Sequence, residues 1–173
     1  GTRHLDINEI RDETRALISQ GHKRLLIVSA EDPAVNIDYL EEAIKSVYET
    51  KEGNGSIRRV NINVAPMGVK DFKKLKQTGI GTYQLFQETY HRDTYSQLHT
   101  SGPKSDYLKR LYACDIAQSA GIDDVGIGAL FGLYDYKFEI LALLFHTLHL
   151  EEVFGVGPHT ISVPRLEQAE GSN

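Results

Sequence analysis

The sequence predicts an α/β protein in which about five parallel strands alternate with crossover helices. Three observations support this class. Short apolar runs that suit buried strands recur along the chain, and each follows a longer segment with the apolar spacing of a helix. Glycines close most of the helical segments, as they do at helix C-termini. The strands then return in the same direction because a helix lies between each pair.

The first helix is expected over residues 6–20. Asp6 suits the N-cap, Glu9 completes a capping box three residues later, and Gly21 ends the helix. The next segment, 23–29, contains four consecutive aliphatic residues. A run of this kind predicts a strand that is buried on both faces.

The same pair of helix and strand recurs along the rest of the chain. Helices are expected over 37–50, 69–78, 104–120 and 135–154, and the strands that follow them over 57–64, 82–87, 124–130 and 160–165. A doubly wound sheet and a (β/α)8 barrel both fit this order. A closed barrel takes about 250 residues, so a barrel would require further segments at one or both ends. The chain begins with a helix and stops soon after a strand, which resembles a cut through a repeating pattern.

Length and composition indicate one globular domain over residues 1–173. The chain is 40% hydrophobic and 25% charged, which disfavours a disordered tail or a fibre. Its net charge of -5 disfavours nucleic acid as a partner. The longest apolar run, 140–145, is too short to cross a bilayer, and the N-terminus has no signal-peptide core. We therefore expect a cytoplasmic protein with no membrane partner.

Cys114 is the only cysteine in the sequence. A single thiol excludes an intramolecular disulfide and any self-contained zinc or iron–sulfur site built from cysteines. We interpret Cys114 as a small buried hydrophobic residue in the middle of a helix.

Candidate site residues follow the strands, because chemistry in either architecture belongs at the carboxyl ends of parallel strands. Glu31 and Asp32 follow the first strand, where they could receive an ammonium or hydroxyl group, although Asp32-Pro33 also suits a simple turn. The polar segment 87–91, which begins with Gln87 and Glu88, follows the third strand. Its alternative is a polar loop that bonds locally.

Arg165 follows the last predicted strand. A cation at the end of a buried strand is costly unless it meets an anion, so we expect an anionic ligand or an ion pair with Glu88 or Glu31. The parallel order also predicts that Glu31, Pro66, Gln87, Leu133 and Arg165 lie along one rim.

His146 and His149 lie three residues apart on the last predicted helix. We interpret them as structural or solvated histidines, since a helix outside a parallel sheet is a poor place for a shared metal. Gly126, Gly128 and Gly132 do not form a dinucleotide-binding turn, because they lie within and after a strand.

Three long segments carry a resemblance to a known family. Residues 81–91 (GTYQLFQETYH), 121–133 (GIDDVGIGALFGL) and 154–165 (FGVGPHTISVPR) resemble the radical S-adenosylmethionine tyrosine lyases. The likeness spans about residues 5–168 and is greatest to the type that matures [FeFe]-hydrogenase, with 2-iminoacetate synthase of thiamine biosynthesis as a close relative.

The resemblance implies a partial (β/α)8 barrel, with this chain supplying strands two to six. It also implies S-adenosylmethionine and a [4Fe–4S] cluster held by three cysteines as cofactors. Tyrosine is the implied substrate, cleaved between Cα and Cβ to p-cresol and dehydroglycine, which the hydrogenase maturase breaks down further to carbon monoxide and cyanide.

Carried over to this sequence, Ala30 and Glu31 match the segment that holds the methionine amino group. Here Ser29 and Ala30 stand where the family usually has two glycines. Gln87 and Glu88 match the positions that address the ribose and methionine groups, and Arg165 matches the rim of strand six. These are the expected S-adenosylmethionine contacts.

The family's cluster loop, Cys-x3-Cys-x2-Cys, is absent from this sequence. The resemblance therefore implies that the chain by itself holds no cluster and is catalytically inert. One alternative is a decayed barrel that serves as a non-catalytic module binding S-adenosylmethionine or a partner.

The two outer strands, 23–29 and 160–165, would each leave one row of backbone groups unpaired. We also expect the inward faces of all five strands to expose an apolar patch once the opposing barrel wall is absent. The expected partners are the remaining barrel segment or a second copy that pairs through these edges.

Overall fold

The computed structural model describes residues 5–29, 35–102 and 105–166 and confirms the α/β class. One five-stranded sheet has the order β1-β4-β5-β6-β7, and all four neighbouring pairs are parallel. The strands are β1 (Arg24–Val28), β4 (Arg59–Asn63), β5 (Tyr83–Gln84), β6 (Val125–Gly128) and β7 (Thr160–Ser162). Within this sheet, each strand pairs with the strand of the sheet that comes next in the sequence. The order therefore never reverses as it does in a doubly wound sheet. The topology is that of a barrel segment.

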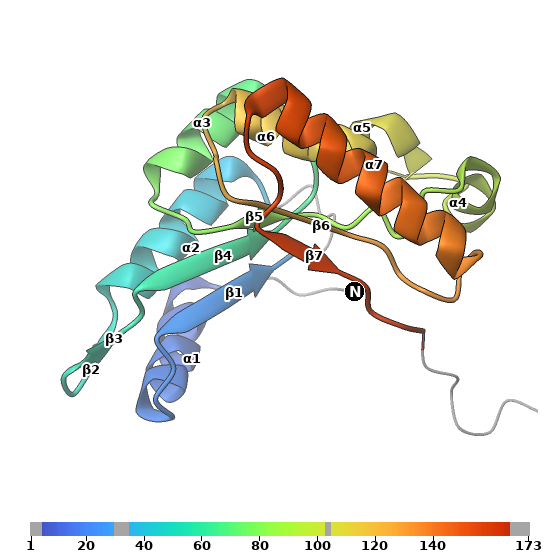
Figure 1. Ribbon diagram of the computed structural model, residues 1–173. Coiled ribbons are helices and arrows are strands. Elements are labelled where there is room, and N and C mark those ends of the chain that lie inside the picture. Colours follow the sequence, from blue (N-terminus) through green and yellow to red (C-terminus); the bar gives the residue numbers. More distant parts are fainter. Residues whose placement is uncertain (1–4, 30–34, 103–104, 167–173) are drawn as a thin grey trace, which may run out of the picture.

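Helices gather on one side of this sheet, and its other face is uncovered (Figure 1). They are α1 (Ile7–Ser19), α2 (Ile37–Glu49), α3 (Val69–Gln77), α4 (Arg92–Leu98), α5 (Tyr107–Leu111), α6 (Ala113–Ser119) and α7 (Tyr136–Phe154). The expected cap of α1 is confirmed, because the Asp6 carboxylate accepts a hydrogen bond of 2.8 Å from the Glu9 amide. None of the described helices combines the length and the apolar character that crossing a membrane requires.

Three local features differ from the sequence-based expectation. The helix predicted over 104–120 is two helices, α5 and α6, that meet at Tyr112, where the backbone leaves helical geometry. The short helix α4 was not predicted. His91 is its N-cap, and the His91 ring accepts a hydrogen bond from the Thr94 amide. A small hairpin, β2 (Lys51–Glu52) and β3 (Gly55–Ser56), precedes β4.

The hydrophobic core lies between the sheet and the helices. Val60 and Ile62 of β4 are fully buried on the helix-facing side of the sheet. Phe72 of α3 meets Tyr83 of β5 edge to face, with ring centroids 4.8 Å apart and both side chains fully buried. The Tyr83 hydroxyl donates to the Val64 carbonyl oxygen at 3.0 Å. This contact joins the helix layer to two neighbouring strands.

The prediction that the first strand is buried on both faces is wrong. Leu26 and Val28 of β1 are 47% and 64% exposed, whereas Leu25 and Ile27 pack against the core. The exposed pair lies on the uncovered face of the sheet, and β1 is an edge strand with a neighbour on one side only. A continuous apolar run does not by itself show whether both faces of a strand are covered.

The expected apolar inward face across all five strands is also wrong. Registered partners share a face, and on the uncovered face the positions beyond β1 are mostly polar or glycine: Asn61, Asn63, Gln84, Gly126, Gly128, Thr160 and Ser162. Glycine is required at position 128, since a Cβ there would lie 2.4 Å from the Ser162 carbonyl oxygen. The uncovered face is therefore largely hydrophilic.

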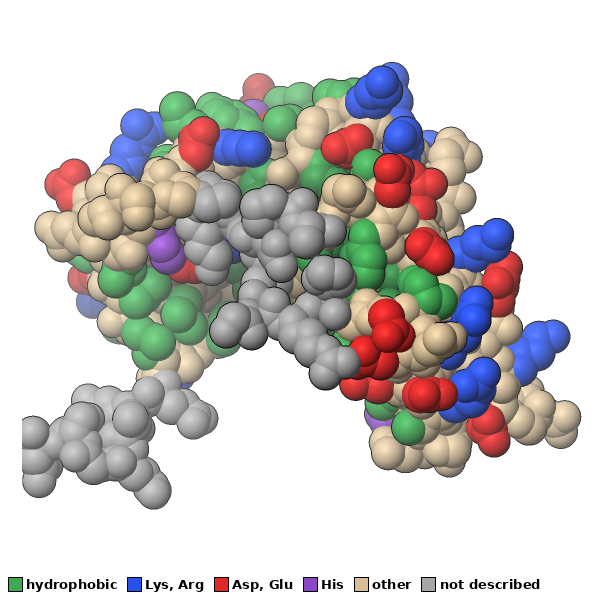
Figure 2. All heavy atoms as spheres, turned by 180° about the vertical axis from the view of Figure 1, so that it is seen from behind, with side chains coloured by type: hydrophobic (Ala, Val, Ile, Leu, Met, Phe, Trp, Pro, Cys, Tyr) green, Lys and Arg blue, Asp and Glu red, His purple; other side chains and the backbone are tan. Residues whose placement is uncertain are grey.

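The outer surface of the helices α1, α2 and α3 carries mixed charge. Seen from behind, acidic and basic side chains are interspersed on the side where α1, α2 and α3 lie (Figure 2). Both signs occur within single helices; α2, for example, has an exposed pair of Lys45 and Glu49 one turn apart. Mixing of this kind favours solubility over attraction to one charge class.

A network of polar groups lies at the amino ends of the strands. The Asp124 carboxylate, just before β6, accepts hydrogen bonds from Arg59 at 2.5 Å and Thr82 at 2.8 Å. His159, just before β7, lies 2.9 Å from the same carboxylate. Burial alone would raise the pKa of Asp124, but the bonds from Thr82, His159 and Arg59 outweigh it and lower the pKa. The network links four strands at the edge of a barrel where stability, and not chemistry, is usually found.

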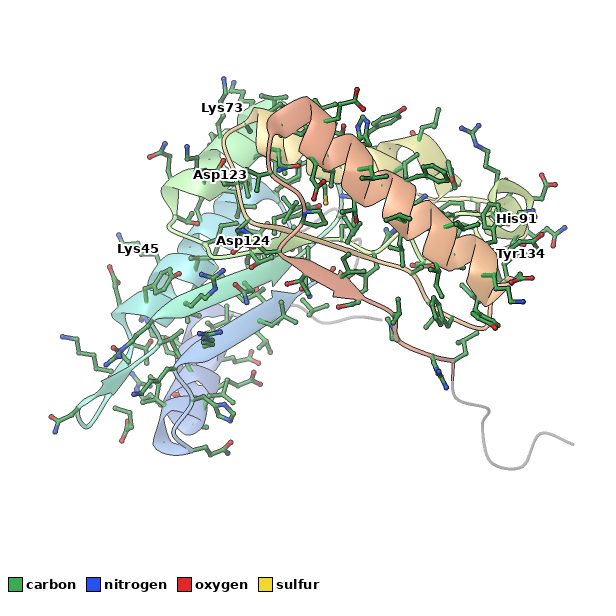
Figure 3. All side chains as sticks on the ribbon, in the orientation of Figure 1. Lys45, Lys73, His91, Asp123, Asp124 and Tyr134 are labelled. Carbon is green, nitrogen blue, oxygen red and sulfur yellow. The ribbon has the colours of Figure 1, made fainter. Side chains whose placement is uncertain are left out.

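Replacing Asp124 with asparagine should lower the free energy of unfolding by about 2–3 kcal/mol at pH 7, because the charged acceptor of several bonds is lost. Asp123, its exposed neighbour, supplies the matched control, Asp123→Asn (Figure 3). The folded-state pKa lies below the ordinary value of 3.8. The stabilisation by the Asp124 carboxylate is therefore present above pH 3.8 and is lost as the pH falls through the lower, folded-state pKa. Denaturant titrations from pH 7 to pH 3 measure the loss of unfolding free energy in each variant. An equal loss in both variants would contradict the stabilising role of the Asp124 carboxylate.

Candidate functional site

The carboxyl ends of the strands meet at one edge of the sheet. Pro66, Gln87, Leu133 and Arg165 all follow strands of parallel register, so the expected rim is confirmed for these described positions. Ala30 and Glu31, the first two predicted site residues, lie outside the described residues. The segment 87–91 after β5, the rim loop, brings five consecutive polar side chains to this rim.

Gln87 supports the rim loop from the inside. Its side chain is 3% exposed, and its Nε2 donates to the Tyr107 carbonyl oxygen at 3.3 Å. Its backbone amide donates to the Gly128 carbonyl oxygen at 2.9 Å, which extends the ladder between β5 and β6 beyond the strand ends. This placement favours a supporting role for Gln87 over a direct side-chain contact with a cofactor.

Glu88 has an unusual backbone conformation. Its φ of 72° lies in the left-handed region, which costs a residue with a side chain about 1–3 kcal/mol. Its carbonyl oxygen accepts a 2.7 Å hydrogen bond from the Leu130 amide. Its carboxylate lies 2.6 Å from His99 Nε2 and 3.6 Å from the Arg110 guanidinium. Strain of this kind is typical of functional sites, where neighbouring contacts maintain it.

Arg110 of α5 is a site residue that the sequence did not reveal. Its side chain is 9% exposed, and its Nε donates to the Phe86 carbonyl oxygen at 2.8 Å. The guanidinium and the Glu88 carboxylate thus lie side by side at the rim, although 22 positions separate them in the sequence. The predicted helix over 104–120 gave no reason to select this arginine over its neighbour Lys109.

Arg165 lies at the far end of the same edge. A parallel bridge joins it to Phe131, so the pairing of β6 and β7 continues past both strands. Its side chain is exposed, and no ion pair joins it to another described residue. The expected pairing with Glu88 is not formed, because the Glu88 carboxylate faces His99 and Arg110. The anionic ligand stays open as an alternative for Arg165, and so does the expected pair with Glu31, which lies outside the described residues.

An aromatic cluster closes one end of the rim. The rings of His91 and Tyr134 are stacked with centroids 3.7 Å apart, and Phe138 meets both edge to face. His91 and Tyr134 lie together near the start of α7, away from Asp124 (Figure 3). The cluster ties the rim loop to the helix that follows β6.

The two histidines of α7 have structural partners in the helix layer. Tyr90 and His146 share a hydrogen bond of 2.6 Å, and His149 is paired with Asp115. Burial lowers the pKa of His146 to about 4, so this ring is neutral at pH 7. These residues line a groove of about 340 Å³ between α5, α6 and α7. No cluster of three potential metal ligands occurs within the described part of the chain.

The sequence comparisons place the chain in a family. Residues 1–145 match the Radical SAM superfamily, and the chain belongs to it. It is 32% identical over 169 residues to 2-iminoacetate synthase of Escherichia coli strain K12; the match covers 96% of this chain and 43% of the relative.

Two solved structures are more similar. The crystal structure of HydG, a maturase of the [FeFe]-hydrogenase, has a TM-score of 0.94 and 57% identity over 99% of this chain. The FeFe-hydrogenase maturase HydG from Carboxydothermus hydrogenoformans has a TM-score of 0.90 and 46% identity. The chain spans 38% and 39% of these two proteins. Together with the parallel topology, these matches confirm a partial barrel of the radical SAM type.

Membership in this family implies S-adenosylmethionine and a [4Fe–4S] cluster, and the residues present fit only the first. Cys114, the single cysteine, is the second residue of α6 and not in mid-helix as expected. It is buried, its thiol lies 3.8 Å from the Gly126 carbonyl oxygen, and burial raises its pKa to about 12. One protonated, buried thiol does not hold a cluster. By contrast, the Glu88 carboxylate and the Arg110 guanidinium suit the charged ends of an amino-acid group.

Anaerobic reconstitution of the 173-residue chain with iron and sulfide should therefore give no stable [4Fe–4S] absorption. Cys114→Ala should behave identically, because the thiol is not available as a ligand. A stable cluster spectrum in the wild-type chain that is lost in Cys114→Ala would contradict this expectation.

Proposed function

We propose that this chain is the S-adenosylmethionine-binding part of a cytoplasmic radical SAM enzyme that cleaves tyrosine between Cα and Cβ. The products are p-cresol and dehydroglycine, and the parent protein supplies carbon monoxide and cyanide for [FeFe]-hydrogenase assembly. The chain supplies barrel strands two to six, and the cluster ligands belong to other segments of the parent. When S-adenosylmethionine is bound together with the cluster, it would supply the group that removes a hydrogen atom from tyrosine.

The juxtaposition of Glu88 and Arg110 carries this proposal. An amino-acid moiety such as that of S-adenosylmethionine presents an ammonium and a carboxylate, which pair with a carboxylate and a guanidinium respectively. Both side chains lie at the carboxyl edge of the parallel sheet, where barrel enzymes bind their ligands. The backbone strain at Glu88 supports a functional role for this position.

The other predicted contacts have different parts in this proposal. Arg165, exposed at the same edge, receives a negatively charged group of the cofactor or substrate. Ala30 and Glu31 remain the predicted contacts to the methionine amino group after β1. Gln87 acts by fixing the rim loop against α5, as its hydrogen bond to the Tyr107 carbonyl indicates.

The remaining barrel segment is the partner that the surface favours. Ile161 and Val163 at the β7 edge are 50% and 43% exposed, and Leu144 and Phe145 of α7 are 52% and 67% exposed. In a barrel, the next helix and strand cover these positions. A second copy that pairs through the β1 and β7 edges is the alternative when the chain is alone.

A chimera tests the proposed activity. This chain would replace the matching 38% of the HydG to which it is 57% identical, so that the cluster loop and the remaining barrel come from that protein. We expect p-cresol from tyrosine within about tenfold of the parent rate. A chimera that folds, carries its cluster and makes no p-cresol would contradict the tyrosine lyase proposal and favour a non-catalytic module.

The same assay separates the hydrogenase type from 2-iminoacetate synthase. Identity is 57% to HydG and 32% to 2-iminoacetate synthase, which favours the maturase. A chimera built on 2-iminoacetate synthase should accordingly be less active than one built on HydG.

A further inference from the structure

Glu139 of α7 is a buried carboxylate outside the candidate site. It is fully buried, and its Oε1 accepts a hydrogen bond of 2.9 Å from the Tyr90 amide. The Thr89 side chain also bonds to it. Its Oε2 has no hydrogen-bond partner among the described residues. Burial raises the pKa of Glu139, although the bonds from Tyr90 and Thr89 partly offset this effect. Removing a carboxyl group from water at this position is costly, since one of its oxygens has no partner among the described residues.

The groups that Glu139 binds belong to the rim loop. The loop is held on its upstream side by β6, because the Gln87 amide donates to the Gly128 carbonyl and the Leu130 amide donates to the Glu88 carbonyl. Glu139 holds it immediately downstream, at Tyr90. Glu88, with its left-handed backbone, thus lies between two anchors. A strained conformation persists only where the surroundings fix both sides of it.

Tyr90 is fixed at three points by the helix layer. Its amide is bound by Glu139, its carbonyl oxygen accepts from the Tyr107 hydroxyl at 2.7 Å, and its own hydroxyl meets His146. Two of these bonds come from side chains of α7 and one from α5. Of these three groups of Tyr90, the amide that Glu139 binds is the nearest along the chain to Glu88.

We propose that Glu139 is a positioning residue for the rim: it holds the rim loop from outside the barrel so that the Glu88 carboxylate is presented beside Arg110. Glu139 itself touches no ligand. The part of this inference that concerns S-adenosylmethionine rests on the proposed function; the part that concerns the loop does not.

Amide hydrogen exchange of the 173-residue chain tests the loop. Glu139→Met fills the space without an acceptor, and Glu139→Gln retains an acceptor oxygen. Leu143→Ala removes a buried side chain of the same helix that has no polar group to bond to the loop. In Glu139→Met, the Tyr90 and Leu130 amides should exchange about tenfold faster relative to the amides of α2. Glu139→Gln should restore the protection to within about threefold, and Leu143→Ala should leave the ratio unchanged.

Unchanged relative exchange in Glu139→Met would overturn the proposal, and so would an equal change in Leu143→Ala. A titration of the same chains with S-adenosylmethionine, followed by amide chemical shifts, separates this outcome from a failure of the proposed function. In the wild type, the Glu88 and Leu130 amides should shift on addition of S-adenosylmethionine. The affinity obtained from these shifts should be about tenfold lower in Glu139→Met and should be restored in Glu139→Gln. Faster loop exchange in Glu139→Met with no shifts in the wild type would support the positioning role and count against the proposed function.

Discussion

Alanine at Arg110 is expected to weaken S-adenosylmethionine binding about 30-fold or more in the HydG chimera, a loss of roughly 2 kcal/mol. The physical reason is the removal of one partner from a nearly buried charge pair, which also leaves the Glu88 carboxylate with less compensation. Isothermal titration with S-adenosylmethionine measures the effect directly.

Lys109→Ala is the matched control for this variant. It removes the same charge from the adjacent position of α5, where the side chain is exposed. Its affinity should stay within about twofold of the unaltered chimera, as expected for an exposed charge. Equal losses in both variants would mean that general electrostatic attraction, and not the Arg110 contact, accounts for binding.

Alanine at Phe72 is expected to lower the free energy of unfolding by about 3–5 kcal/mol. The ring is fully buried and meets Tyr83 at 4.8 Å, so its removal leaves a cavity between α3 and the centre of the sheet. Tyr83 also loses the neighbour that orients its hydroxyl toward the Val64 carbonyl.

Guanidinium titration of the chain measures this loss. Val69→Ala, on the same helix but 41% exposed, should cost less than about 1 kcal/mol. If Phe72→Ala lost no more than the Val69 variant, the interface between α3 and β5 would not be the centre of the core.

Local signals predicted much of the fold. Asp6 and Glu9 mark the first helix correctly because a capping box involves neighbouring residues only. The alternation of helices and strands is likewise visible in apolar spacing. The continuous apolar run of β1 misled, because whether a face is covered depends on distant segments and not on the run itself.

The candidate site was predicted in part. Glu88 could be found because polar residues directly follow an apolar strand. Its left-handed backbone could not, since that conformation is imposed by Leu130 and by the contacts of Tyr90. Arg110 was missed for a related reason: its position depends on the break between α5 and α6, and no short-range signal marks that break.

We propose that the carboxyl edge of this sheet binds S-adenosylmethionine. The most direct measurement is an amide chemical-shift titration of the isotopically labelled wild-type chain with S-adenosylmethionine. We expect shifts confined to that edge, at the rim loop, at Arg110, at 130–133 and at Arg165. Binding at the carboxyl edge would be contradicted by shifts centred on the amino edge around Asp124 or on the groove between α5, α6 and α7. The absence of any shift at millimolar ligand would also contradict it.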